Sequence, residues 1–170
     1  GTAHLYRGEL DAAARLLMEA LALAWRVGDD VEIANQVQRF VALASSGGLR
    51  DLALHLLRTG DALDQALGIT VTNRDPDVVA WYRERLGVDA IELAGGTFPA
   101  AVAVAQAVGL AYLIGSEILG KEETTAIWAN TGAPVSPSLV ASEHWKEPGT
   151  SLPEQPRASA ADVFDLTRRE

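Results

Sequence analysis

The chain has 170 residues, no cysteine and a formal net charge of -9 at pH 7. This length allows one domain that buries a core without cross-links, and the lack of cysteine excludes disulfides, thiolate catalysis and thiolate zinc sites. The acidic charge argues against nucleic acid as a direct ligand of this chain, because such binding draws most of its affinity from basic contacts.

The chain also lacks the patterns of a membrane or secreted protein. No window reaches the roughly 18 consecutive apolar residues of a membrane span, and no basic start precedes an apolar run as in a signal peptide. We therefore expect a cytoplasmic protein. Because the chain opens on Gly1 rather than methionine, we also expect it to be part of a longer one.

The N-terminal two thirds predict a series of amphipathic helices. Thr2 to Tyr6 is typical of the end of a longer helix, and further helices are expected over 9–27, 31–44, 49–67, 76–86 and 88–94 from apolar residues at i, i+3, i+4 and i+7. Glycines end these helices, and Asp29 or Asp30 and the pair Asp75-Pro76 are the expected starts of two of them. On the helix that opens at Pro76, Val79, Tyr82 and Leu86 are expected on one face.

One spacing occurs twice in this region. The pattern G-x4-A-x3-L-x2-small recurs after about 40 residues, first as Gly8, Ala13, Leu17 and Ala20 and then as Gly48, Ala53, Leu57 and Gly60. The glycine ends one helix, and the small residue five positions later lets the next helix pack closely. The sequence therefore predicts stacked helical hairpins.

The C-terminal third has a different character. A helix is expected over 98–107, and the almost wholly apolar run 102–119 is either a buried helix or a short strand by periodicity alone. We favour a helix there, because the preceding elements are helical, and another over 121–130. The segment 131–159 holds five of the seven prolines and predicts a flexible linker, and 160–170 is a short amphipathic piece.

The sharpest chemical motif is Gly115–Lys121, which fits the G-x-x-x-x-G-K of a phosphate-binding loop. That loop would need residues 108–114 to form a strand. It would also need a hydroxyl at the eighth position, where Glu122 places a carboxylate toward the triphosphate. We favour a helix that stops at Gly120 and another that starts after it.

No catalytic, cofactor-binding or metal-ligating residue is predicted. The histidines lack metal-ligand spacing, the serines lack a nucleophile elbow, and the paired carboxylates and the arginines suit helix ends. These residues are His4, His55 and His144; Ser45, Ser46 and Ser116; Asp29, Asp30, Glu122 and Glu123; and Arg83 and Arg85.

The aromatic residues leave two interpretations open. They could line a ligand groove between hairpins, or they could pack in the core, which we favour because large aromatic side chains are mostly buried. The residues concerned are Trp25, Phe40, Trp81, Tyr82 and Trp128.

Residues 8–23 resemble the second helix of a tetratricopeptide repeat, whose glycine and small or large positions match Gly8, Ala13, Leu17 and Ala20. The chain departs from that repeat at Trp25, where a proline is usual, and in a period longer than the standard 34 residues.

Three longer stretches are similar to the last repeats of large bacterial LuxR-type transcriptional regulators and cover roughly residues 5–107. They read ALALAWRVGDD, ALASSGGLRDLALHLLRTGDALDQALG and PDVVAWYRERLGVDAIELAGGTFPAAVAVAQA. In that family an ATPase module, often behind a cyclase-like one, precedes helical repeats and a helix-turn-helix. Leu166-Thr167-Arg168-Arg169-Glu170 resembles the opening of this DNA-binding domain, which places the basic recognition helix downstream of Glu170. Residues 110–156 are longer than the usual connection.

These observations predict an all-α protein. Tetratricopeptide-like antiparallel helical hairpins would occupy 1–130, a linker 131–159, and the truncated start of a LuxR-type helix-turn-helix 160–170. The resemblance implies a non-catalytic, cofactor-free sensor region in which a protein or small-molecule inducer binds a helical groove. The signal would pass to the downstream DNA-binding domain or to a homodimer, without a membrane. A free-standing tetratricopeptide-like scaffold and a nucleotide-binding enzyme are the alternatives.

Overall fold

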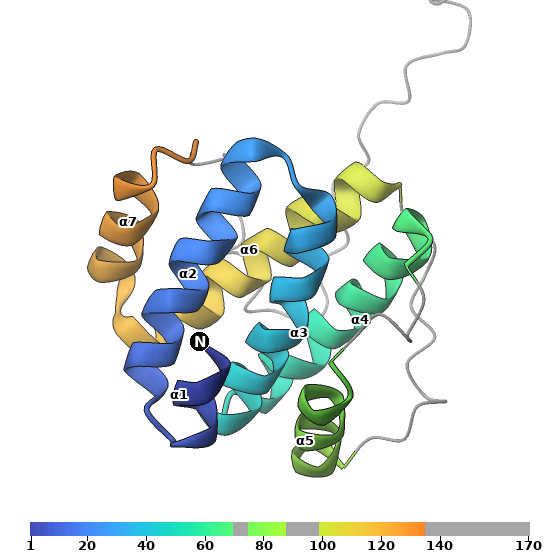
Figure 1. Ribbon diagram of the computed structural model, residues 1–170, viewed down its shortest axis with the longest axis vertical. Coiled ribbons are helices and arrows are strands. Elements are labelled where there is room, and N and C mark those ends of the chain that lie inside the picture. Colours follow the sequence, from blue (N-terminus) through green and yellow to red (C-terminus); the bar gives the residue numbers. More distant parts are fainter. Residues whose placement is uncertain (70–74, 88–98, 135–170) are drawn as a thin grey trace, which may run out of the picture.

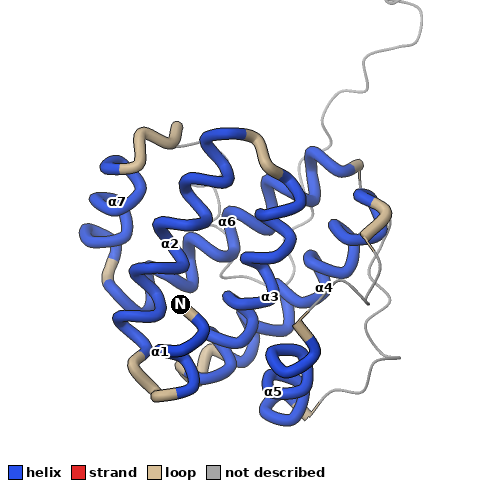
Figure 2. The backbone as a smooth tube through the Cα atoms, in the orientation of Figure 1, coloured by secondary structure: helices blue, strands red, loops and turns tan. Residues whose placement is uncertain are grey.

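A computed structural model of the chain describes residues 1–69, 75–87 and 99–134, and within these ranges every regular element is a helix (Figures 1 and 2). The all-α prediction is confirmed. The helices are α1 (Thr2–Tyr6), α2 (Leu10–Val27), α3 (Asp30–Ser46), α4 (Arg50–Leu67), α5 (Pro76–Leu86), α6 (Ala100–Leu119) and α7 (Lys121–Asn130). The helix predicted over 88–94 and most of the predicted linker and C-terminal piece lie outside the described residues.

The repeated spacing corresponds to a repeated backbone turn. Gly8 between α1 and α2 and Gly48 between α3 and α4 both have positive φ, 74° and 75°, which glycine adopts without steric cost. In both turns an amide donates to a carbonyl five residues earlier, Glu9 to His4 at 3.0 Å and Leu49 to Ala44 at 2.9 Å. Each residue of the first turn corresponds to the residue 40 positions later in the second turn. The connection between α2 and α3 has the same geometry, because Gly28 has a φ of 71° and the amide of Asp29 donates to the carbonyl of Ala24 at 3.0 Å. The first four helices are therefore joined by the same kind of glycine turn.

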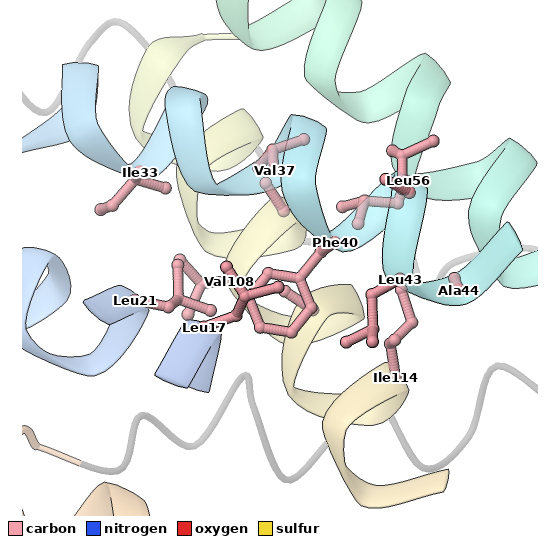
Figure 3. Packing of buried hydrophobic residues seen from close by; sticks show 14 of the residues in the cluster. Leu17, Leu21, Ile33, Val37, Phe40, Leu43, Ala44, Leu56, Val108 and Ile114 are labelled. Carbon is pink, nitrogen blue, oxygen red and sulfur yellow. The ribbon is translucent and has the colours of Figure 1, made fainter. Parts of the chain in front are cut away.

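Helix α3 is the centre of the molecule, in contact with α1, α2, α4, α5 and α6. Figure 3 shows Phe40 of α3 pointing among Leu17 and Leu21 of α2 and Val108 of α6, all almost completely buried. Each such side chain contributes about 1.5–3 kcal/mol when it leaves water. The core is thus assembled around one helix that is covered on several sides.

The apolar run after residue 102 is one long helix, α6, and the strand alternative is wrong. It lies behind α2 and α3 in Figure 1 and contacts α2, α3 and α4. In the described part of the chain, α6 alone has the length and composition to cross a membrane, with a window of mean hydropathy 1.7. Half of that window is buried among the other helices, and a core helix passes the same test.

Two glycines inside helices allow close approach of a neighbour. A Cβ at Gly60 of α4 would lie 2.8 Å from Cγ1 of Val37 in α3, and one at Gly115 of α6 would lie 2.6 Å from Sδ of Met18 in α2. Glycine costs roughly 1 kcal/mol of helix propensity at such positions. Glycine is present despite this cost because α4 packs closely on α3 and α6 packs closely on α2.

Helix α5 begins as predicted, since the Asp75 carboxylate accepts a hydrogen bond from the amide of Asp77 at 3.1 Å. The predicted buried face needs one correction. Val78, Tyr82 and Leu86 are buried, whereas Val79 is only partly covered. Helix α5 packs mainly against α3. The residues that it buries completely there have i, i+4, i+8 spacing and form a narrow stripe along the helix.

We expect Gly60→Ala to lower stability although alanine is the better helix former. The added methyl meets Cγ1 of the stiff, β-branched Val37, and overpacking of this kind costs about 1–3 kcal/mol. Thermal and urea unfolding would measure the change. The reverse substitution at the corresponding position of α2, Ala20→Gly, is the matched control and should cost only the propensity difference of about 1 kcal/mol. A Gly60→Ala protein as stable as the parent would contradict this packing.

Candidate interaction surface

The Gly115–Lys121 segment does not form a loop. Helix α6 continues through Gly115 to Leu119, Gly120 ends it with a φ of 89°, and α7 starts at Lys121. A phosphate-binding loop needs free backbone amides after a strand, but amides inside a helix already donate to carbonyls of the preceding turn. The predicted helix boundary at Gly120 is therefore confirmed.

The histidines lie apart in the part of the chain that the structure describes. His55 is on the surface, and His144 lies outside the described residues. The Nδ1 of His4 contacts the carboxylate of Glu9, five residues later, and this carboxylate also accepts a hydrogen bond from Arg7 at 3.1 Å. The Arg7 hydrogen bond, and then the His4 contact, lower the pKa of the Glu9 carboxyl. No three potential metal ligands gather within the described ranges.

One carboxylate of each pair, Asp29 and Glu123, has a structural partner. The Asp29 side chain accepts from the amide of Glu32 at 2.9 Å, which confirms it as the N-cap of α3. Glu123 in the first turn of α7 accepts from Nε of Arg15 in α2 at 2.5 Å, and this hydrogen bond raises the pKa of Arg15. Both groups are exposed, so the pair adds little stability. It connects two helices and shows no arrangement for acid–base chemistry.

The aromatic residues do not meet in one groove. Phe40, Tyr82 and Trp128 are completely buried, which confirms core packing for these three. They belong to α3, α5 and α7. Trp25 and Trp128 both donate from their indole nitrogens to the carbonyl of Pro134, at 3.2 and 3.4 Å. The first residues of the predicted linker therefore pack against α2 and α7.

One aromatic cluster does reach the surface. The ring of Tyr6 in α1 meets the ring of Trp81 in α5 edge to face, with centroids 5.6 Å apart. The guanidinium of Arg85 lies 4.0 Å from the centre of the Trp81 ring. Tyr6 is 52% exposed, Arg85 is exposed and Trp81 is half-buried. We call these three residues the aromatic patch.

The sequence of α5 explains how Trp81 and Arg85 come together. They are four residues apart and thus neighbours on one side of the helix. The adjoining stripe anchors α5 to α3, where the Tyr82 hydroxyl donates to Oε1 of Gln38 at 2.8 Å in a buried site. This anchor fixes the rotation of α5 and so directs the Trp81–Arg85 pair toward α1.

The aromatic patch suits protein recognition better than catalysis. Tryptophan, tyrosine and arginine are enriched among residues that dominate binding energy at interfaces, and a cation–π pair at an exposed site contributes about 0.5–1 kcal/mol. Partial burial raises the pKa of the Tyr6 hydroxyl, and the carboxylates of Asp75 and Asp77 raise it further. The hydroxyl therefore stays neutral and able to donate a hydrogen bond at physiological pH.

Sequence reasoning identified only part of this patch. The four-residue spacing of Trp81 and Arg85 is visible in the sequence and could have indicated their contact. We had expected Arg85 only to interact favourably with the dipole at the end of its helix. Tyr6 gave no such signal. It is 75 residues away from Trp81 along the chain and reaches it only through the packing of α1 and α5 about α3.

No protein-family model, curated protein or solved structure matches this chain. The structure itself describes an all-α protein with a repeated glycine turn between helices and an exposed aromatic patch.

We expect Trp81→Ala to lower the pKa of Tyr6 toward its ordinary value near 10, because the indole ring contributes to the burial that raises it. In the parent protein burial and the two carboxylates disfavour the ionised hydroxyl, so the raised pKa leaves stability unchanged below the unfolded-state pKa and lowers it as pH rises from there through the folded-state pKa. NMR titration of the tyrosine ring carbons, assigned with Tyr6→Phe, would measure the shift. Asp77→Asn should cause a smaller decrease. An unchanged pKa in Trp81→Ala would show that Trp81 does not cover the hydroxyl.

Proposed function

We propose that this chain is a non-catalytic helical interaction region that binds a partner and transmits its presence to another part of the same protein. The observation that carries the proposal is the exposed aromatic patch on a framework of helices joined by repeated glycine turns. Helices built from such repeats present extended surfaces to partners. We also propose that α1 to α4 are related to tetratricopeptide hairpins, on the strength of the repeated turn and spacing.

The partner is expected on the side formed by α1 and α5. Helix α6 contacts α2, α3 and α4 and so occupies one side of the hairpins, whereas the aromatic patch lies on α1 and α5. This location favours a protein, since a small-molecule inducer in a helical groove would need a concave site. A homodimer is included among the protein partners.

The resemblance to LuxR-type transcriptional regulators supports a more specific role. In that family, helical repeats precede a helix-turn-helix, and Leu166–Glu170 resembles the opening of that domain. We propose a cytoplasmic regulator in which the helical region controls a DNA-binding domain downstream of Glu170. The acidic charge of this chain agrees with DNA contacts made elsewhere. A free-standing scaffold is the alternative, and it would carry the same helices without a following helix-turn-helix.

The full-length protein should continue beyond Glu170 into a basic helix-turn-helix of LuxR type. Sequencing of the reading frame tests this directly. A downstream region without two helices of that pattern would contradict the regulator and leave the scaffold, since the helical region would then have no DNA-binding domain to control.

Nucleotide binding at Lys121 is expected to be absent. Because Gly115–Leu119 is helical, titration of ATP and Mg²⁺ into the protein should give no more heat than buffer in a calorimeter. Lys121→Ala is the matched variant. Heat that is present in the parent and lost in this variant would overturn the non-catalytic assignment and favour a nucleotide-dependent enzyme.

A further inference from the structure

Helix α7 and the residues that follow it fold back on α2. We call residues 121–134 the α7 arm, and Figure 1 shows its helix beside α2 at one edge of the molecule. Nη1 of Arg26 in α2 donates to the carbonyl of Thr131 at 2.7 Å, and the indole nitrogen of Trp25 donates to the carbonyl of Pro134 at 3.2 Å. Together with the ion pair that joins α2 to the first turn of α7, these hydrogen bonds form a latch that holds the arm at both ends.

The arm contributes few apolar side chains to the core. Helix α7 buries Thr124 and Trp128, and the residue after its end that is buried is Ala133. The Trp128 ring meets the ring of Tyr112 in α6 edge to face, with centroids 5.7 Å apart. Elements with few buried apolar contacts open at a lower free energy than the core does. The arm can therefore leave α2 while the helices around α3 stay folded.

A single residue, Gly120, separates the arm from α6. Its φ of 89° and ψ of 151° fall in a region of backbone conformation that is essentially restricted to glycine. The glycines that end α2 and α4 differ from it, because Gly28 and Gly68 have left-handed helical values, with ψ of 34° and 23°. A Cβ at Gly120 would meet no atom of the described residues within 4 Å. Backbone conformation, rather than close packing, therefore calls for glycine at this junction.

A change of conformation at Gly120 would join α6 and α7 into one helix. The hydrogen bonds of α6 end where the Gly120 amide donates to Ser116 at 3.0 Å, and those of α7 begin where the Thr124 amide donates to the Gly120 carbonyl at 3.1 Å. In a continuous helix, amides at the junction would donate four residues back, as from Glu122 to Ile118. Glycine offers no side-chain cap to α7, unlike the aspartates that cap α3 and α5. The straight form would gain these hydrogen bonds and lose the burial of the arm.

We infer that the α7 arm is a two-state relay, latched on α2 in this structure and continuous with α6 when the latch opens. Release would carry Pro134, and with it the start of the chain that follows, away from α2. Helix α7 has ten residues and is thus about 15 Å long, so the displacement is of that order. The latch residues belong to α2, which also contacts α1, the helix that carries Tyr6. The inference rests on the proposed function only in that it supplies a route for the transmission.

The test measures the distance between α2 and α7 in the full chain. The chain has no cysteine, so spin labels can be attached at Glu19→Cys and Ala129→Cys, which are exposed on the two helices. Pulsed EPR should give one short distance in the labelled parent. Gly120→Ala should enlarge a second population, longer by about 10 Å or more, by at least about tenfold. The reason is that alanine disfavours the latched backbone conformation at this residue and favours a continuous helix.

Two further variants separate release of the arm from general destabilisation. Trp25→Phe removes the indole donor of the latch and keeps an aromatic ring, so in the Gly120→Ala background it should increase the long-distance population further. Gly28→Ala is the matched control, because it places alanine at another glycine of positive φ, 71°, where α2 ends. It should lower the thermal midpoint and leave the label distance unchanged. Far-UV circular dichroism of Gly120→Ala should show no loss of helix.

Two outcomes would overturn the inference. The first is a Gly120→Ala/Trp25→Phe protein with the same distance distribution as the parent. The second is a broad distribution together with a loss of helix, because the arm would then unfold rather than straighten. Neither outcome depends on Trp81 or on a helix-turn-helix, so a failure here is distinguishable from a failure of the proposed function.

Discussion

The burial of α3 is the interaction on which the other helix contacts depend. This helix touches α1, α2, α4, α5 and α6, and its apolar residues from Ile33 to Ala44 are almost completely removed from water. Even two of its glutamines, Gln36 and Gln38, are buried. Because hydrophobic burial scales with the area removed from water, the loss of α3 would expose one face of five other helices at once.

Close approach between helices gives this packing its specificity. Val37 fits against Gly60, so α4 lies nearer to α3 than a larger residue would allow. The Tyr82 hydroxyl satisfies the buried carbonyl oxygen of Gln38 and sets the rotation of α5. A buried amide without that partner would cost about 1–3 kcal/mol. Shape and one polar contact thus determine where α4 and α5 lie, after hydrophobic burial has brought them to α3.

The repeated hairpin and the surface it displays have different origins. The turn after α1 and the turn after α3 share glycine geometry and hydrogen bonds, because both follow from a local pattern of residues. The surfaces differ, since Leu16 and Leu23 of α2 are 43% and 44% exposed, whereas Leu56 and Leu63 of α4 are buried. These exposures and the aromatic patch are therefore products of which helices meet.

Much of the fold was predictable from residues close together in the sequence. The helices, the caps at Asp29 and Asp75, and the stops at Gly28, Gly68 and Gly120 follow from apolar spacing and from backbone preferences within one or two turns. The complete burial of Val78 rather than Val79 was not predictable. Both residues fit a helical stripe, and only the position of α3 decides which of them is buried.

The sequence by itself determined that the chain is helical, where most described helices begin and end, and that one residue spacing occurs twice. These properties depend on hydrogen bonds and steric limits within a few residues. Only the tertiary structure decided that Tyr6 meets Trp81, that Glu123 pairs with Arg15, and that α6 packs across three helices. Such contacts join residues far apart in the sequence, and they depend on the summed packing of all helices around α3, which no local pattern encodes.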